Sequence, residues 1–390
     1  MIELNKQSEC TSCGACVNVC PKKAISLLPD ESGFLYPYIE SNECVGCSLC
    51  NTVCQMELKS KQEDYEQTFY ALVNKNEKHL KVSSSGGAFL AVADYVFKQG
   101  GIVAGCAFDE NQKAIHTITN NLDDCIDKLC GSKYVQSETQ YTYTNVKKLL
   151  NDGKIVLYVG TPCQIEGLLL FLKKKPQNLI TMDLICHGVS SPLLWEKHKS
   201  YLENKVHAKI NKYRFRGKEK AGWALYYYYY YYYYGGKNRC KQGPSLLDRY
   251  YTDFLKGVNY RESCYQCRYA NLDRVGDITI GDFWGAEKYI DGVDLHDGIS
   301  LVIINSQRGN EIIQHISDKV TLKQITKENA IEDNHNLVAP TSRPPERNDY
   351  YRRCFSDFEE WEKEYVKTRN WKLAKLKSKI PSFIKKALRR

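Results

Sequence analysis

Residues 10–21 read CTSCGACVNVCP, and residues 44–55 read CVGCSLCNTVCQ. Both stretches place four cysteines with two, two and three residues between them, and both end one residue later, at Pro21 and Gln55. Thiolates with this spacing hold 4Fe-4S cubanes, and the fourth cysteine of each run ligates the cluster of the other run. The sequence therefore predicts two 4Fe-4S clusters in one small N-terminal domain, so one-electron transfer is part of the expected function.

The crossed ligation gives each cluster its own ligands. Set one is Cys10, Cys13, Cys16 and Cys54, and set two is Cys20, Cys44, Cys47 and Cys50. Zinc is the alternative metal, but zinc takes its cysteines in two pairs and not as three evenly spaced residues plus one. The pattern is typical of bacterial two-cluster ferredoxins, so we expect a ferredoxin-like domain over residues 1–57.

Length, composition and charge narrow the class of protein. The 390 residues leave room for a larger domain after the cluster module. Seventeen cysteines without a secretion signal indicate metal and redox use, and a cytoplasmic location is expected. No stretch reaches the roughly 18 apolar residues that span a membrane. The net charge of +9 resides in the ten basic residues of 367–390, so the near-neutral body argues against nucleic-acid binding.

After a charged linker at 59–66, strands and helices alternate along the chain. We expect strands at 69–73, 102–108, 155–159 and 179–185, and helices after Gly87, at 144–150, at 165–174 and from about Pro192. Strands that are followed by glycine-bearing turns and helices indicate a largely parallel sheet. The predicted fold class is therefore α+β or α/β, with the small ferredoxin-like domain followed by a larger mixed α/β domain over 66–345.

Four further cysteines lie in turns after predicted strands or in a CxxC pair. They are Cys163, Cys186, Cys264 and Cys267, and we call them set three. Because ligands gather at the carboxyl ends of parallel strands, these thiols are expected to meet and to hold a third 4Fe-4S cluster. Two alternatives stay open at this point: a zinc site, and separate buried thiols without a ligand role.

A flavin would complete the redox chemistry. Clusters pass single electrons, whereas most organic substrates take two, and a flavin can do both. The loop Ser83-Ser84-Ser85-Gly86-Gly87 opens a predicted helix, where backbone N–H groups can hold a pyrophosphate. The alternative for this loop is an ordinary helix start with flexible glycines.

Six short segments follow one another in a specific order. They are SSGG at 84–87, GSKY at 131–134, GTPCQ at 160–164, CHG at 186–188, SCYQC at 263–267 and DITIGDFWG at 277–285. Their order and spacing resemble the β subunit of coenzyme F420 hydrogenase/dehydrogenase over about residues 66–345. The resemblance implies an FAD near an iron–sulfur cluster, with the flavin exchanging hydride with a second redox partner.

The resemblance also implies site residues. Flavin-binding candidates are Ser85, Gly86, Gly87, Ser132, Lys133 and Tyr134, and set three supplies the cluster ligands. The cationic Lys133 is expected to offset negative charge on the flavin. No catalytic residue is assigned, because packing and turn formation explain Asp277, Asp282 and Trp284 as well as catalysis does. Members of this family often accompany surface-polysaccharide genes, which suggests a link to that biosynthesis.

The leading functional hypothesis is an iron–sulfur flavoprotein oxidoreductase. It would move electrons between a redox partner protein or ferredoxin and a small two-electron substrate. Two alternatives from other classes are a non-catalytic electron-transfer subunit that serves a partner enzyme, and a cluster-based sensor. Bound flavin and turnover by the purified protein alone would distinguish these three.

Two segments lie outside this chemistry. Nine consecutive tyrosines at 226–234, followed by Gly235-Gly236, predict one limb of a β-hairpin, and a homopolymer has no period that selects an inward face. Residues 346–390 are predicted as a basic tail. Its apolar face comprises Trp371, Leu373, Leu376 and Ile380 and resumes after Pro381 with Phe383, Ile384, Ala387 and Leu388. Such a helix can lie on an anionic membrane surface, which makes peripheral membrane contact one hypothesis for the tail. The alternatives are a solvated helix, or a disordered tail that docks on a partner protein or aids solubility.

Overall fold

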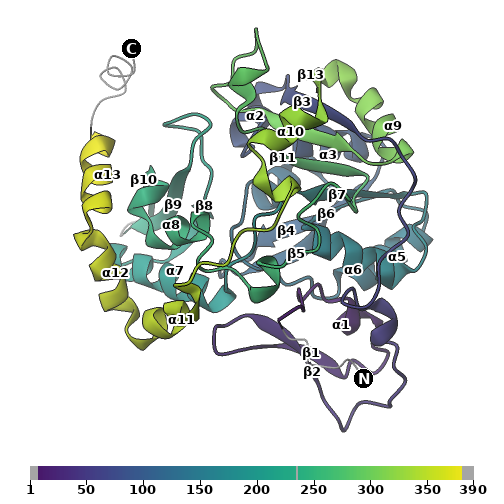
Figure 1. The fold of residues 1–390 in the computed structure, drawn as a ribbon, viewed down its shortest axis with the longest axis horizontal. Coiled ribbons are helices and arrows are strands. Elements are labelled where there is room, and N and C mark those ends of the chain that lie inside the picture. Colours follow the sequence, from purple (N-terminus) through teal and green to yellow (C-terminus); the bar gives the residue numbers. More distant parts are fainter. Residues whose placement is uncertain (1–7, 234–235, 380–390) are drawn as a thin grey trace.

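Among the described residues of this computed structural model, 8–233 and 236–379, eight strands form the central sheet of the body (Figure 1). In spatial order they are β13 (Val320–Ile325), β3 (Thr68–Asn74), β12 (Ser300–Ile304), β11 (Ile278–Asp282), β7 (Leu179–Leu184), β6 (Val156–Gly160), β4 (Ile102–Phe108) and β5 (Ala114–Thr119). The four strands predicted from the sequence correspond to β3, β4, β6 and β7.

The sheet is mixed. β4, β6, β7 and β11 run parallel to one another, whereas β5, β12, β3 and β13 each pair antiparallel with a neighbour. The expectation of a largely parallel sheet was therefore wrong for the outer strands. The five residues between β4 and β5, 109–113, are too few for the crossover that a parallel pair needs. The predicted class, a small ferredoxin-like region before a larger mixed α/β domain, is confirmed.

Helices cover both faces of the central sheet and surround a second, smaller sheet. In chain order the helices are α1 (Ala15–Val19), α2 (Glu77–Val82), α3 (Ala88–Lys98), α4 (Leu122–Asp124), α5 (Thr142–Asn151), α6 (Pro162–Leu172), α7 (Pro192–Val206), α8 (Arg249–Leu255), α9 (Gln307–His315), α10 (Lys327–Glu332), α11 (Arg347–Ser356), α12 (Phe358–Lys367) and α13 (Arg369–Lys379). On β6, Leu157 packs under α3 and α9, while Val156 and Tyr158 pack under α5 and α6. Successive side chains of β6 therefore point to opposite faces of the sheet and belong to two separate hydrophobic cores.

Helix α6 begins earlier than the sequence predicted. Pro162 is its first residue, and Thr161 forms a capping box with Gln164. Proline suits the first helical position, and the reciprocal cap satisfies two backbone N–H groups. As a result Cys163 lies in the first turn of α6 and not in the preceding turn.

The N-terminal module packs against the body beside α5 and α6 (Figure 1). It contains α1 and the hairpin β1 (Ile25–Pro29) with β2 (Leu35–Ile39). The fully buried Arg261 of the body anchors it: Nε donates to the Cys10 carbonyl at 2.7 Å, and Nη1 donates to the Leu35 carbonyl at 2.9 Å. Its guanidinium also lies 3.9 Å from the centre of the Tyr36 ring. Charge-assisted hydrogen bonds of this kind hold the two parts in one orientation.

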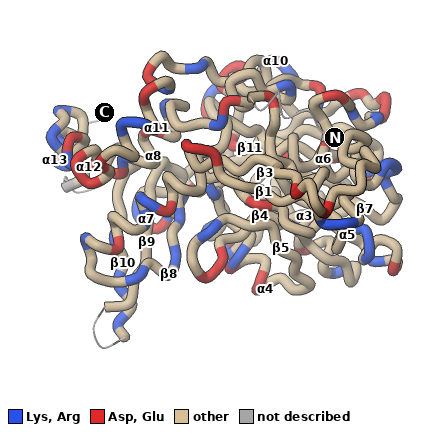
Figure 2. Tube along the Cα trace, turned by 90° about the horizontal axis from the view of Figure 1, so that it is seen from below, with Lys and Arg blue, Asp and Glu red and all other residues tan. Residues whose placement is uncertain are grey.

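The tyrosine run forms the middle strand of the second sheet, whose hairpin projects from the body (Figure 2). This sheet comprises β8 (Ile210–Arg214), β9 (Tyr226–Tyr233) and β10 (Lys237–Pro244). Tyr234, at the end of the predicted limb, and Gly235, in the predicted Gly-Gly turn, lie outside the described residues. Although the run has no period, glycines on its neighbours select the faces: a Cβ at Gly217 would lie 2.3 Å from the Tyr228 ring, and one at Gly243 would lie 3.0 Å from the Tyr227 hydroxyl.

Residues 347–379 form three helices, α11 to α13, along the outside of this second sheet (Figure 1). In α13, Ala374 is buried and the Trp371 indole donates to the Leu247 carbonyl at 3.3 Å, whereas Leu373 and Leu376 are exposed. The predicted apolar face beyond them, from Ile380 to Leu388, lies outside the described residues. A search of 8–233 and 236–379 finds no helix with the length and apolarity needed to cross a membrane.

A buried histidine ties the C-terminal helices to the body. His198 of α7 lies 3.0 Å from Glu362 of α12 through Nδ1 and 3.0 Å from Asp248 through Nε2. Burial alone would lower the pKa of His198, but the two carboxylates outweigh it and raise this pKa to about 10. The imidazolium therefore contributes stability fully below about pH 6.5, its unfolded value, and this contribution is lost as the pH rises through 10.

We expect the melting temperature of the protein to fall as the pH is raised from 7 toward 10, and His198→Gln to flatten that decline. Glutamine carries no charge at any pH, so the linkage between protonation and folding disappears. Thermal unfolding followed by circular dichroism across this range measures the slope. An equally steep slope in the variant would show that other groups titrate.

Candidate functional site

Set one gathers in the module close to the body. Burial is the main cause of the raised pKa of Cys16, and the neighbouring Cys13, Cys10 and Cys54 raise it further. Cys10 likewise acts on Cys54. The first three cysteines of the first run thus lie beside the last cysteine of the second run, in the crossed arrangement that the spacing predicted.

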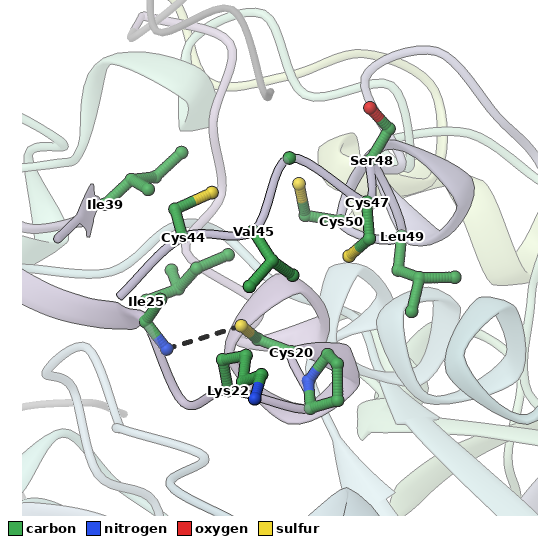
Figure 3. Close-up of a pocket in the computed structure, with 13 residues that line it drawn as sticks. Cys20, Lys22, Ile25, Ile39, Cys44, Val45, Cys47, Ser48, Leu49 and Cys50 are labelled. Atoms are coloured by element: carbon green, nitrogen blue, oxygen red, sulfur yellow. Dashed lines mark hydrogen bonds between the residues drawn. The ribbon is translucent and has the colours of Figure 1, made fainter. Parts of the chain in front are cut away.

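Set two lines a small pocket that is open to solvent (Figure 3). Cys20 of the first run joins Cys44, Cys47 and Cys50 of the second run in its wall. The backbone N–H of Ala24 donates to Cys20 Sγ at 3.3 Å. Cys47 is exposed, so this set faces outward.

Set three comes together from three segments of the body. Cys163 lies in the first turn of α6, and Cys186 follows β7. Cys264 ends the 3-10 helix Glu262–Cys264, and Cys267 follows after a short turn. Burial raises the pKa of Cys163 to about 12, and Cys267 and Cys264 contribute in the same direction. Burial also raises the pKa of Cys186, to which Cys264, Cys163 and Cys267 add. The four predicted thiols therefore lie near one another.

Each of the three sets offers four thiol ligands. Within the described ranges, no three Cys, His, Asp or Glu side chains converge closely enough to hold one metal ion. A tetrahedral zinc would draw thiolate sulfurs to about 2.3 Å from a single point, whereas a 4Fe-4S core separates its ligands by a larger inorganic body. Thiols grouped in fours are the donors that such cores require.

Set one and set three approach each other across α6. A Cβ at Gly167 would lie 2.8 Å from Cys13 Sγ, so only glycine permits this contact. The Tyr143 hydroxyl lies 2.7 Å from the Cys13 carbonyl oxygen and 2.8 Å from that of Gln164. Cys163 is also among the groups that raise the pKa of Cys13, after burial and Cys10.

The glycine loop before α3 packs closely against neighbouring strands of the central sheet. A Cβ at Gly86 would lie 2.1 Å from the Leu72 carbonyl oxygen and 2.4 Å from the Ser300 backbone nitrogen. Gly87 has φ +83°, and Ser85 Oγ donates to the Ile299 carbonyl at 2.7 Å. The sheet alone accounts for these two glycines, so enlarging them would test folding and not ligand binding.

In the second candidate segment, residues 132–134, each side chain contacts a different part of the protein. Ser132 donates through N and Oγ to Ser84 Oγ, at 2.9 and 3.0 Å. Lys133 Nζ donates to the carbonyls of Leu129 and Cys130, and burial lowers its pKa. Its amine therefore closes a local helical turn and does not point to an open anion site. The Tyr134 ring stacks on Phe254 with centroids 4.3 Å apart.

A buried ion pair that the sequence did not reveal connects the two candidate segments at 84–87 and 131–134. Arg216, which follows β8, donates to Asp282 at 2.7 Å, and its guanidinium lies 5.3 Å from the Trp284 ring. The same arginine lies 3.4 Å from both the Tyr134 hydroxyl and the Ser84 carbonyl oxygen. Trp223 Nε1 donates to Asp282 at 2.8 Å and stacks on Trp284. Asp282 and Trp284 belong to the sequence segment DITIGDFWG at 277–285, but nothing in the sequence pointed to Arg216.

The Arg216–Asp282 ion pair lies next to set three, and His187 connects the two. Burial lowers the pKa of His187, so its imidazole is neutral at pH 7; Asp282 and Arg216 also act on it. Since His187 directly follows Cys186, the cysteine set and the ion pair are neighbours. Arg216 Nε is buried and has no hydrogen-bond partner in the described part of the chain. An unpartnered guanidinium nitrogen flanked by aromatic rings fits an anionic aromatic cofactor such as a flavin.

Comparisons with known proteins match two parts of the chain. Residues 153–328 match the family described as the C terminus of the coenzyme F420 hydrogenase/dehydrogenase beta subunit, and residues 9–57 match the 4Fe-4S dicluster domain. The search of curated proteins gives no match. A chain in a structure of the F420-reducing NiFe hydrogenase complex from Methanosarcina barkeri is similar at 19% identity and a TM-score of 0.44, covering 78% of this chain and 94% of that chain.

The matches bear directly on the resemblance drawn from the sequence. Four of its six segments, from GTPCQ at 160–164 to DITIGDFWG at 277–285, lie within residues 153–328. The two serine- and glycine-bearing segments, at 84–87 and 131–134, precede the matched range. The resemblance to the F420 hydrogenase β-subunit family and the N-terminal 4Fe-4S domain are confirmed.

Proposed function

We propose that this chain, an iron–sulfur protein related to the F420 hydrogenase β-subunit family, is a flavoprotein oxidoreductase with three 4Fe-4S clusters and one FAD. One observation carries the proposal. Set two faces solvent, and its Cys50 is a neighbour of Cys54 in set one. Set three adjoins set one across α6, and the Arg216–Asp282 pair adjoins set three through His187. These contacts form one continuous series from the surface to the polar site.

The residues have distinct roles in this proposal. When bound, a flavin exchanges two electrons with an organic partner and single electrons with clusters. Arg216 would hold the negative charge of the FAD, and Asp282 fixes the orientation of the guanidinium. Tyr134 and Trp284 offer aromatic faces, and the hydroxyls of Ser84 and Ser132 offer hydrogen bonds. The neutral His187 can hold or release a proton at its imidazole nitrogen.

The same arrangement of cysteine sets and ion pair suggests where the redox partner protein and the substrate would bind. A redox partner protein or ferredoxin would dock beside the exposed Cys47, and a small two-electron substrate would meet the site at Arg216. The link to surface polysaccharides rests on the family resemblance alone. Exposed Leu373 and Leu376 among the lysines of α13 support contact with an anionic membrane surface. A non-catalytic subunit is the alternative, and turnover by the purified chain alone would exclude it.

We expect Arg216→Gln to weaken FAD binding by about ten- to a hundredfold, the cost of losing one charge-assisted hydrogen bond. Flavin released from the anaerobically purified variant, and titration with FAD, measure this. Arg214→Gln is the matched control, because Arg214 ends the same strand but pairs with the exposed Glu219. If both variants bound FAD as the natural protein does, Arg216 would have no role in flavin binding.

A further inference from the structure

The two cysteine runs of the module end differently, and the two ends lie in different surroundings. Pro21 follows Cys20 of set two; it is exposed and lines the outward pocket. Gln55 follows Cys54 of set one and is only 3% exposed. The residue that follows the last cysteine thus differs between the runs, and the buried one of the two lies where the module packs against the body.

Every polar group of the Gln55 side chain has a partner. Its Nε2 donates to Thr11 Oγ1 and to the Cys163 carbonyl oxygen, each at 2.9 Å. Its Oε1 accepts from the Tyr269 hydroxyl at 2.5 Å. A proline at this position could make none of these bonds, because its side chain has neither donor nor acceptor.

These partners belong to the segments that carry two different ligand sets. Thr11 lies between Cys10 and Cys13 of set one. Cys163 belongs to set three, and Tyr269 is two residues beyond Cys267 of the same set. One side chain thus joins the loops of both sets.

We infer that Gln55 is a positioning residue that fixes set one against set three. The inference rests on the proposed function, in which both sets hold clusters. Outer-shell hydrogen bonds orient metal ligands, and hydrogen bonds to ligand sulfurs help to set cluster potentials. Gln55 makes outer-shell bonds to the loops of both sets at the junction, whereas the side chain of the exposed Pro21 makes none for set two. The difference between the two runs therefore marks set one as the end of the module that is coupled to the body.

The test uses full-length Gln55→Leu, which keeps the side-chain volume and removes all three bonds. Cluster potentials are measured by redox titration with electron paramagnetic resonance. We expect the potential of the set-one cluster to shift downward, with that of set two unchanged and iron content still about twelve per chain. Cleavage by protease in the linker 59–66 should also become faster. Gln62→Leu, at an exposed linker position, is the control.

A second variant guards against a folding defect. Tyr269→Phe removes only the hydroxyl that holds Gln55 Oε1, so we expect a smaller shift of the same sign. Unchanged potentials and unchanged proteolysis in both fully loaded variants would overturn the positioning role and leave the proposed function standing. A natural protein that binds no third cluster would overturn both.

Discussion

Cys186→Ala in the full-length protein is expected to lower bound iron from about twelve to about eight atoms per chain, because one of three cubanes loses a ligand. The loss should be confined to set three. Its four thiols come from three segments of the body, whereas the ligands of the other two sets all lie within residues 10–54 of the module. Iron and sulfide analysis of anaerobically purified protein, together with electron paramagnetic resonance, measures the change.

Cys240→Ala provides the matched control, since Cys240 is an exposed cysteine on β10 outside all three sets. It should leave iron and sulfide unaltered. Equal iron content in Cys186→Ala and the natural protein would remove Cys186 from the ligand set. Loss of all iron would instead show that the module depends on the body for its own clusters.

Arg274→Leu is expected to lower the free energy of unfolding by about 3–5 kcal/mol, the usual cost of leaving a buried charge without its partner. Arg274 Nη2 donates to Asp183 at 2.8 Å and to the Leu184 carbonyl at 2.8 Å, and both side chains of the ion pair are almost fully buried. Its Nη1 donates to the Tyr269 carbonyl at 2.8 Å. The arginine thereby fastens the segment after Cys267 to strand β7.

Urea unfolding under anaerobic conditions measures this loss, and set three should lose its iron along with it. Lys59→Ala is the control because Lys59 pairs with Asp273 of the same segment at 3.5 Å, but both side chains are exposed. Exposed pairs contribute little, so that change should stay within about 0.5 kcal/mol. A loss below about 1 kcal/mol for Arg274→Leu would show that water reaches Asp183 and replaces the arginine.

The cysteine runs and the inner strands were predictable because their signals are local. The spacing of Cys10 to Cys20 specifies a ligand loop without reference to the rest of the chain. Strand β4 lies at the predicted residues 102–108, since Gly100-Gly101 and a turn at Asp109 bound an apolar run. The prediction of set three combined the rule that turns after parallel strands meet at one edge with the CxxC pair and the family resemblance.

Contacts between distant single residues could not be predicted in this way. Arg216 and His198 are isolated polar residues, which in a sequence look like ordinary surface positions. Only the packing of β8 against the end of β11, and of α12 against α7, brings their acidic partners to them. The Gly86-Gly87 pair shows a related limit: a sequence does not tell whether close backbone approach serves a ligand or a neighbouring strand.

The tyrosine strand has a consequence for how the gene can change. Because the codons for tyrosine are nearly identical, such a tract is a simple DNA repeat, which replication slippage lengthens or shortens. Side chains alternate between the faces of a strand, and Gly217 and Gly243 fix which tyrosines occupy each face. Because every residue of the tract is tyrosine, gain or loss of codons leaves tyrosine beside Gly217 and Gly243 and alters the length of the projecting hairpin. Alleles should therefore differ in the reach of this hairpin while the packing at its base stays the same.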